Sequence, residues 1–449
     1  MKTRIYFLLG LCLLFILQLS AQTPDTALKA YVDKEDLSYT WEIKDTYDRN
    51  GCNVYSIFLI SQKWQGMLWK HELIVYVPDR LEHDGAMLFI TGGGLDENRF
   101  PKFAAQDDPT GEALSRMAAE NKAPVALLRQ VPNQPLYGGL NEDALIAYTL
   151  NEFRKTNDYS WPLLFPMVKS ATRAMDAVQE LLKEKHNKSI NRFLVTGASK
   201  RGWTTWLTAA SGDSRVVAIA PMVIEMLNMP AFFKSQLTAY GGYSEEIGDY
   251  VNMQIPQAVE SEFGKQVVQM IDPYSYLSKI TIPKLIIMAA NDPYWTIDAI
   301  QNYIADIPGK YALHYVPNAG HNMGDKKSVF EALNAFFYQT LNGQSLPDYE
   351  WELAQKKKIT LDVKYEIHGL KEIVLWQTSS PTRDLRKGTW ISTNVMLVKN
   401  KKEVDVNIDF PKQGYKAFFV ELKYESPLGG TYSVCTSAYV ADAKQVFVK

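Results

Sequence analysis

The chain has 449 residues, more than the length at which a single hydrophobic core usually stops growing. Hydrophobic residues make up 46% and charged residues 22% of the sequence, proportions that exclude a disordered or fibrous protein. The 48 Lys and Arg residues nearly balance the 50 Asp and Glu residues, and this near-neutral charge argues against a dedicated nucleic-acid binder. Three cysteines are too few for a disulfide-dense scaffold or a multi-cysteine zinc module.

The N-terminus has the pattern of a secretory signal peptide. Lys2 and Arg4 form a basic segment, residues 5–19 are almost entirely apolar, and small residues precede Gln22, so we expect cleavage after Ala21. A membrane anchor is the alternative, but the apolar run is shorter than the roughly 20 residues that a spanning helix needs. No later stretch is apolar enough to cross a bilayer. We therefore expect a periplasmic or secreted protein without an integral membrane segment.

The cysteines of the mature chain are Cys52 and Cys435, because Cys12 leaves with the signal peptide. Leu11 precedes Cys12 and is larger than the residue that lipoprotein signals favour at that position. An exported protein can form a disulfide, but pairing of Cys52 with Cys435 would require two domains to meet there. We favour two unpaired structural cysteines, and the pairing stays open at this stage.

Strand-like and helix-like segments alternate along the first three quarters of the mature chain. The expected strands are residues 54–62, 72–77, 87–91, 124–128, 191–196, 216–221, 284–289 and 311–316. The expected helices are residues 110–120, 142–153, 163–185, 203–210 and 327–341. Strands separated by helices indicate a largely parallel sheet covered on both faces. A mixed helical stretch at 223–278 lies where such folds insert a cap.

The composition changes near Leu346. Short strand-like runs then follow at residues 359–368, 372–376, 389–398, 403–410, 417–424 and 431–441, with Gly, Pro, Asn and Asp between them. Such runs without a helical pattern predict an all-β sandwich of the immunoglobulin-like kind. The expected organisation is a signal peptide at 1–21, an α/β domain at 22–345, a polar linker at 345–357 and the sandwich at 358–449.

The segment Gly197-Ala198-Ser199-Lys200-Arg201-Gly202 follows an expected strand and precedes a helix. A serine on a sharp strand-to-helix turn is held clear of both elements, where a base can reach its hydroxyl. The common form of this motif is G-x-S-x-G, but here Arg201 takes the place of the second glycine and Gly202 follows it. The alternative is a serine that only caps the helix.

A nucleophilic serine needs a base and an acid. Of the six histidines, His321 lies on a Gly-flanked loop directly after the last expected parallel strand, where a base can lie over the nucleophile. Asp292 directly follows the preceding strand and would orient the base. Glu225 is the alternative acid. The chain order Ser199, Asp292, His321 is that of α/β-hydrolases.

The three glycines at positions 92–94 follow the strand at 87–91 and predict an oxyanion site. Glycine lets the backbone approach a substrate oxygen closely, so the donors would be the amides of Gly93 and Gly94 together with that of Lys200. The alternative is a flexible loop. Dinucleotide, Walker and H-E-x-x-H motifs do not occur, so we expect neither a cofactor nor a metal.

Other charged residues near these motifs have simpler interpretations. The pair Glu142 and Asp143 begins an expected helix, where the helix dipole favours acidic residues. Lys200 and Arg201 could bind an acidic substrate, but we expect a solvated pair.

Several segments resemble the PhoPQ-activated pathogenicity-related protein family. They are the serine motif and the stretches 142–148 (EDALIAY), 161–169 (WPLLFPMVK) and 220–223 (APMV). The resemblance covers nearly all of the mature chain, implies an α/β-hydrolase fold, and maps the serine, acid and histidine of the family onto Ser199, Asp292 and His321. The family is also related to autocrine proliferation repressor proteins. The glucuronoyl esterases look like distant cousins, because they share the G-x-S-x-x-G spacing.

These features predict an exported serine hydrolase that cleaves an ester or related acyl bond through an acyl-enzyme. The substrate would be a small molecule or a polymer that carries an acyl group, and we expect no nucleic-acid partner. A peptidase on the same scaffold is one alternative. A secreted, non-catalytic binding or signalling protein of the same family is the other.

Overall fold

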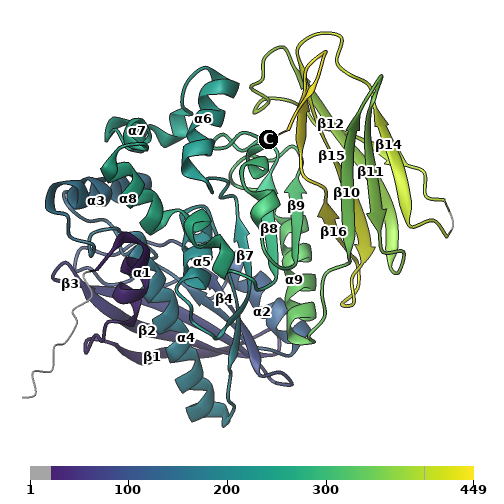
Figure 1. The fold of residues 1–449 in the computed structure, drawn as a ribbon. Coiled ribbons are helices and arrows are strands. Elements are labelled where there is room, and N and C mark those ends of the chain that lie inside the picture. The colour runs from purple at the N-terminus through teal and green to yellow at the C-terminus, as the bar shows by residue number, and fades with distance from the viewer. Residues whose placement is uncertain (1–21, 399, 449) are drawn as a thin grey trace, which may run out of the picture.

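The computed structural model describes residues 22–398 and 400–448, so the expected signal peptide lies outside the described residues. An α/β part and a strand-rich C-terminal part lie side by side in Figure 1. One large mixed sheet runs through both parts, in the strand order β1-β2-β3-β5-β4-β6-β7-β8-β9-β16-β15-β12-β13. The expected combination of a mixed sheet with covering helices is therefore present.

Nine strands of this sheet belong to the α/β part. They are β1 (Thr40–Arg49), β2 (Cys52–Trp64), β3 (Met67–Pro78), β4 (Gly85–Ile90), β5 (Val125–Leu128), β6 (Arg192–Ala198), β7 (Val216–Met222), β8 (Lys284–Ala289) and β9 (Tyr311–Val316). The strands β1, β2 and β3 pair antiparallel, as do β3 and β5. From β5 through β4 and β6 to β9, all neighbours are parallel. The carboxyl ends of these parallel strands therefore meet at one edge.

Helices cover both faces of the sheet, and alternate strand residues face opposite layers. The main helices are α1 (Pro24–Asp33), α2 (Pro109–Asn121), α3 (Glu142–Thr156), α4 (Leu164–His186), α5 (Lys200–Ala210) and α9 (Lys327–Leu341). Phe193 and Val195 of β6 pack in the core that includes α4 and α5, whereas Leu194 packs in the core that includes α2 and α9. Each such buried side chain contributes about 1.5–3 kcal/mol of hydrophobic stabilisation.

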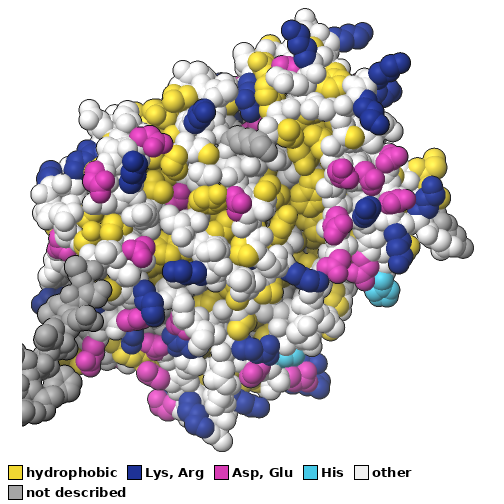
Figure 2. Space-filling view, viewed as in Figure 1, with side chains coloured by type: hydrophobic (Ala, Val, Ile, Leu, Met, Phe, Trp, Pro, Cys, Tyr) yellow, Lys and Arg dark blue, Asp and Glu magenta, His cyan; other side chains and the backbone are white. Residues whose placement is uncertain are grey.

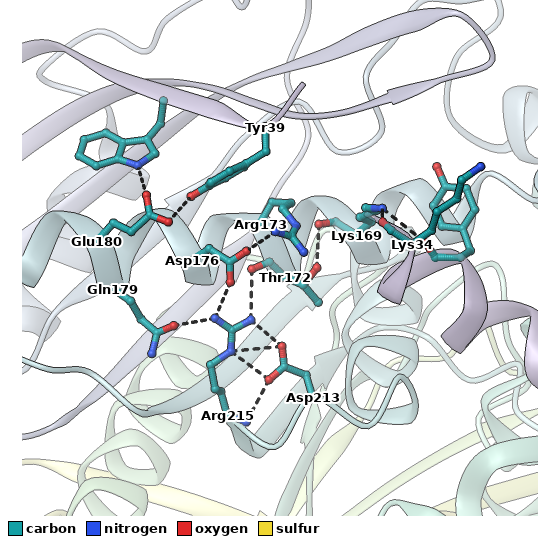
Figure 3. Close-up of polar contacts among 12 residues, drawn as sticks. Lys34, Tyr39, Lys169, Thr172, Arg173, Asp176, Gln179, Glu180, Asp213 and Arg215 are labelled. Atoms are coloured by element: carbon teal, nitrogen blue, oxygen red, sulfur yellow. Dashed lines mark hydrogen bonds and ion pairs between the residues drawn. The ribbon is translucent and has the colours of Figure 1, made fainter. Parts of the chain in front are cut away.

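Two clusters of polar contacts along α4 reach the edge strand β1 and the residue that precedes β7 (Figure 3). Arg215, which directly precedes β7, forms ion pairs of 2.6 Å with Asp176 of α4 and with Asp213. Glu180 lies one turn further along α4 and accepts a hydrogen bond from the indole of Trp41 in β1. These contacts, one helical turn apart, hold this part of α4 against β1 and against the residue before β7.

Helical segments between β7 and β8 lie beyond the carboxyl edge of the sheet (Figure 1). They are α6 (Met229–Tyr240), α7 (Gly248–Asn252), α8 (Glu262–Ile271) and the short 3-10 turns Glu245–Ile247, Pro256–Ala258 and Pro273–Lys279. Asp272 is fully buried and accepts hydrogen bonds from the amides of Asn228 and Met229, which begin α6. It also accepts from the amide of Tyr274. One side chain thereby anchors both ends of this insertion.

The C-terminal part consists of strands in two sheets. The strands are β10 (Tyr349–Gln355), β11 (Ile359–Tyr365), β12 (Leu370–Ser380), β13 (Ile391–Val395), β14 (Glu403–Ile408), β15 (Tyr415–Glu425), β16 (Thr431–Cys435), β17 (Tyr439–Ala441) and β18 (Val446–Phe447). The strands β10, β11 and β14 form a separate sheet. Buried side chains of β11, such as Leu361, share one apolar core with Leu375 of β12 and Val420 of β15. Figure 2 shows acidic side chains gathered over the outer face of the three-stranded sheet.

The outer edge of β9 is covered by the C-terminal part. The backbone pairing of β9 with β16 is limited to Leu313 and Cys435. Two outward amides of β9 are satisfied by side chains instead: that of Leu313 donates to the hydroxyl of Tyr349, and that of Tyr315 donates to the thiol of Cys435. The α/β part therefore depends on C-terminal side chains to complete its last strand.

The observed elements differ from the expected ones at several places. The stretch expected as a linker contains strand β10, whose Trp351 and Leu353 lie opposite Val363 and Leu361 of β11. The run expected at 431–441 is divided into β16 and β17. Helix α1 and strand β1 were not expected, because the residues of β1 alternate between exposed and half-buried and give no apolar run.

Both described cysteines are free thiols, as we favoured from the sequence. Cys52 begins β2 and Cys435 ends β16, and each is buried. Burial raises the pKa of the Cys52 thiol to about 12 and also raises that of Cys435.

No helix within residues 22–398 and 400–448 is long and apolar enough to span a membrane.

The buried thiols give a first prediction for protein that lacks residues 1–21. We expect the native protein to react very slowly with Ellman's reagent, because the reactive thiolate is rare and inaccessible. The denatured protein should release two equivalents of the thiol product, one for each cysteine. Reductant should leave the midpoint of thermal unfolding unchanged, and a midpoint that falls with reductant would show that Cys52 and Cys435 pair.

Candidate active site

Ser199 occupies the turn between β6 and α5 in a backbone conformation that few serines adopt. Its φ is 59° and its ψ is -126°, which places it in the sterically unfavourable region for a residue with a Cβ. Such strain costs about 1–3 kcal/mol and must be offset by the surroundings. The amide of Ser199 donates to the carbonyl of Met222 at the end of β7, and its carbonyl accepts from the amide of Trp203.

Two glycines make room for this turn. A Cβ at Gly202 would lie 2.7 Å from the carbonyl oxygen of Met222 and 3.1 Å from that of Gly197. A Cβ at Gly197 would lie 2.9 Å from the carbonyl oxygen of Ile90 in β4. Gly202, three residues after the serine, is thus the helix residue that meets the backbone of β7. This explains why the second glycine stands at 202 and why position 201 can hold an arginine.

The structure brings Ser199, His321 and Asp292 into one hydrogen-bonded line. His321 Nε2 lies 2.8 Å from Ser199 Oγ, and His321 Nδ1 lies 2.7 Å from Asp292 Oδ2. A histidine that carries its proton on Nδ1 donates to Asp292 and accepts from the serine hydroxyl. The three residues follow β6, β8 and β9, so the parallel strands place them at the same edge of the sheet.

The acid and the ring of the base are held by their neighbours. Asp292 is 4% exposed, and its second oxygen accepts a hydrogen bond from the amide of Tyr294. The ring of Tyr294 packs on the imidazole of His321 with 4.3 Å between the centroids. The loops that carry the two residues also bond to each other, because the amide of Asn291 donates to the carbonyl of Ala319. These contacts restrict the imidazole to the orientation that faces Ser199.

The alternative acid, Glu225, makes no hydrogen bond to His321. Its Oε1 accepts from the hydroxyl of Tyr303, and its Oε2 has no partner within the described part of the chain. Burial raises the pKa of Glu225 to about 8, so this carboxyl is largely protonated at neutral pH. A neutral acid that makes no hydrogen bond to the imidazole is a poor stabiliser of an imidazolium. The geometry therefore favours Asp292 as the partner of His321.

The expected oxyanion donors lie on two segments next to Ser199. The amide of Lys200 is the first of α5, where the helix dipole is positive. Gly93 and Gly94 follow β4, and none of these three amides has an acceptor among residues 22–398 and 400–448. A Cβ at Gly92 would lie 2.7 Å from Nη2 of Arg201, so this glycine segment runs directly beside the nucleophile turn.

Lys200 and Arg201 do not form the solvated pair that we expected. Lys200 Nζ lies 2.8 Å from Asp143 Oδ2, and the guanidinium of Arg201 forms a bidentate pair with Glu142 at 2.6 and 2.8 Å. Both cationic side chains are only about a tenth exposed. Glu142 and Asp143 are separated from their partners by almost 60 positions in the chain. The sequence therefore gives no sign of these ion pairs, and the helix dipole alone is enough to account for two acidic residues at the start of a helix. The hydroxyl of Tyr250 also donates to Asp143.

A narrow apolar cavity of about 40 Å³ lies beside Ser199. Its walls come from the nucleophile turn, the loop after β7, helix α6 and the segment after Asp292. They are Asp143, Ser199, Lys200, Trp203, Ile224, Met226, Met229, Phe232, Phe233, Ile247, Tyr250, Tyr294 and Trp295. The described residues contain no group of three or more His, Cys, Asp or Glu arranged to hold a metal ion.

The site is thus a serine, a histidine and an aspartate that follow β6, β9 and β8 at the carboxyl edge of the parallel part of the sheet. The chain belongs to the PhoPQ-activated pathogenicity-related protein family, whose model matches residues 28–386. It is similar to autocrine proliferation repressor protein A of Dictyostelium discoideum, with 28% identity over 448 positions that cover 92% of this chain and 89% of that protein.

Similar solved structures include three with hydrolase names. Acetyl xylan esterase 1 from Thermoanaerobacterium sp. JW/SL YS485 has 16% identity and a TM-score of 0.45, over 66% of this chain and 88% of that one. An S-formylglutathione hydrolase from Agrobacterium tumefaciens has 12% identity and a TM-score of 0.45, over 67% and 99%. A glucuronoyl esterase from Solibacter usitatus has 12% identity and a TM-score of 0.39, over 66% and 87%.

The close approach at Gly202 gives a second prediction. Gly202→Ala forces a methyl group against the backbone of β7, and such overpacking costs about 1–3 kcal/mol. We expect a lower midpoint of thermal unfolding together with a displaced Ser199. The matched control is Gly242→Ala, because a Cβ at Gly242 would meet nothing within 4 Å. Equal midpoints for the two variants would contradict the role of Gly202.

Proposed function

We propose that this protein is an exported serine hydrolase of the α/β-hydrolase type, which cleaves an ester or related acyl bond. The observation that carries the proposal is the pair of hydrogen bonds that link Ser199 Oγ to His321 and His321 to Asp292. A buried acid, an oriented imidazole and a hydroxyl in this order are the parts that acyl transfer by a serine requires. Membership in the family fits this proposal.

The chemistry follows from the positions of the three residues. His321 Nε2 takes the proton of Ser199 Oγ as that oxygen attacks the acyl carbon of the substrate. The negative charge that develops on the carbonyl oxygen is met by the amides of Lys200 and of Gly93 or Gly94. The imidazolium, stabilised by Asp292, then protonates the leaving group as the carbon–oxygen bond breaks. Water attacks the acyl-enzyme by the same steps in reverse and restores Ser199.

We further propose the domain organisation in which residues 22–345 form the catalytic domain, with a helical cap at about 223–278. The C-terminal residues would form an immunoglobulin-like β-sandwich, which is supported by the common core of the β11 and β12–β15 side chains. Since β10 belongs to these sheets, this domain would begin before residue 358. The basic and apolar residues 1–21 support export.

Labelling by a fluorophosphonate probe tests the proposed nucleophile. The wild type should be labelled, Ser199→Ala should not, and Asp292→Asn should react about 10⁴-fold more slowly because the imidazole loses its orienting charge. Glu225→Gln is the matched control: it replaces a protonated carboxyl that does not contact His321, so its labelling rate should equal that of the wild type. A wild type that resists labelling would sink the proposal and favour the non-catalytic binding or signalling alternative.

A panel of substrates separates the two enzymatic alternatives. We expect turnover of p-nitrophenyl esters or acetylated sugars, with release of the free acid, and none of aminoacyl amides. Turnover of the amides at a similar kcat/KM would instead assign the site to a peptidase. Ser199→Ala measured in parallel shows whether each activity comes from this site.

A further inference from the structure

The cavity beside Ser199 has the chemistry of a pocket for a neutral apolar group. Its inner wall is formed by side chains that are almost completely buried, among them Met226, Met229 and Phe232 at 4%, 3% and 2% exposure. Its polar wall carries Asp143, but the charge of that carboxylate is met by Lys200 at 2.8 Å. A substrate group that carried its own charge would find no free counterion in this wall.

The size of the cavity limits what can enter. An apolar cavity of about 150 Å³ can hold a benzene ring, so a cavity of about 40 Å³ leaves room for only a small group. The surrounding rings are already in contact, because Phe232 lies 5.2 Å from Phe233 and 5.5 Å from Trp295 between centroids. A longer chain would have to displace these packed side chains, which is unfavourable.

The position of the cavity indicates which half of the substrate it takes. Ser199 and Lys200 both line it, so it lies directly beside the proposed nucleophile. The acyl group stays bonded to the serine while the leaving group departs to solvent. A narrow cavity with buried apolar walls therefore suits the acyl side of the substrate, which does not have to leave until water has reacted.

From these observations, and resting on the proposed function, we propose that the site hydrolyses esters of short, uncharged acids of about two to four carbons. The acetyl group is the best fit. Met226, Met229 and Phe232, which line the cavity, limit the length of the acyl group. The alcohol half lies outside this cavity and is not restricted by it.

A chain-length series tests this assignment. With p-nitrophenyl esters of two, four, eight and twelve carbons, kcat/KM of the wild type should be highest at two to four carbons and at least tenfold lower at eight. Met226→Ala removes part of the cavity wall and should shift the optimum towards longer chains. The matched control is Leu237→Ala, on helix α6 but 46% exposed and outside the cavity lining, and its profile should match the wild type.

The possible failures are distinguishable. A wild type that prefers eight or more carbons would overturn the short-acyl assignment and leave the serine hydrolase intact. An unchanged profile in a folded Met226→Ala protein, or in the milder Met226→Val, would show that Met226 does not limit the acyl length. Circular dichroism identifies the folded variants. Absence of both ester turnover and fluorophosphonate labelling would overturn the proposed function itself.

A second observation concerns the segment between β12 and β13, which reaches from the C-terminal part to the catalytic loops. Asn318 lies three residues before His321, and it both accepts from the amide of Trp390 at 2.7 Å and donates to its carbonyl at 2.9 Å. Asn291, adjacent to Asp292, donates to the carbonyls of Arg386 and Gly388 at 3.0 and 2.7 Å. One segment thus bonds to both loops.

The same segment is anchored from its other side. The guanidinium of Arg386 lies 4.0 Å from the ring centroid of Tyr240 in α6. Arg383 forms an ion pair of 2.8 Å with Asp298, and both side chains are nearly buried. The segment is therefore rigid enough to fix the loops that it bonds.

We infer that Asn291 and Asn318 are positioning residues, through which the C-terminal part holds the acid and base loops in register. This inference also rests on the proposed function. A displacement of about 1 Å at a reacting group can cost about 10²-fold in rate, so loss of either amide should lower kcat. KM should change little, because neither side chain lines the substrate cavity.

The test compares Asn318→Ala and Asn291→Ala with Gln301→Ala. Gln301 also bonds the C-terminal part, through Ser437 and the carbonyl of Ala438, but it lies away from the catalytic loops. We expect all three variants to have lower thermal midpoints and only the asparagine variants to lose kcat and labelling rate, by tenfold or more. Equal loss of stability with unchanged kcat in all three would show that the asparagines are merely structural and would overturn the inference.

Discussion

The contact between helix α5 and the backbone of β7 is the constraint on which the site depends. Gly202 lets the first turn of α5 lie against the carbonyl of Met222, and the amide of Ser199 bonds the same carbonyl. These two contacts hold the serine in its unfavourable conformation and offset the cost. The hydroxyl then lies at the edge where β8 and β9 also end. Asp292 and His321, which follow these two strands, therefore reach it without long loops. The positions of Ser199, His321 and Asp292 are therefore set mainly by where the parallel strands end.

Charge behind the nucleophile is balanced locally. Arg201 replaces the glycine of the common motif and would be an isolated charge beside the oxyanion segment without Glu142. Arg201 is 11% exposed and Glu142 is 38% exposed, so loss of Glu142 would leave the buried charge of Arg201 unpaired, at a cost that solvent screening reduces. Lys200 and Asp143 form a second pair at the same turn. Helix α3, which begins with Glu142 and Asp143, therefore belongs to the site as much as the strands do.

Local patterns in the sequence were sufficient for the parallel strands and for the chain order of serine, acid and histidine. Strands β8 and β9 and helix α9 have the expected bounds, because compact apolar runs and clear helical spacing mark them. The ion pairs of Lys200 and Arg201 could not be predicted, because they join residues almost 60 positions apart. Strand β10 was hidden in a polar stretch that is stabilised by pairing with β11. The bonds of Asn318 and Asn291 to the C-terminal part likewise depend on tertiary contacts that no local pattern encodes.

The incomplete pairing of β9 has a consequence for the order in which the chain becomes structured. Within the described part of the chain, the amides of Leu313 and Tyr315 are satisfied by Tyr349 and Cys435, so this edge of the sheet stays incompletely paired until Cys435 has been synthesised. An unpaired strand edge is a template for association with other chains. A product truncated by an early stop codon would therefore be prone to aggregate. The C-terminal strands thus protect an edge of the sheet that is formed by residues made before them.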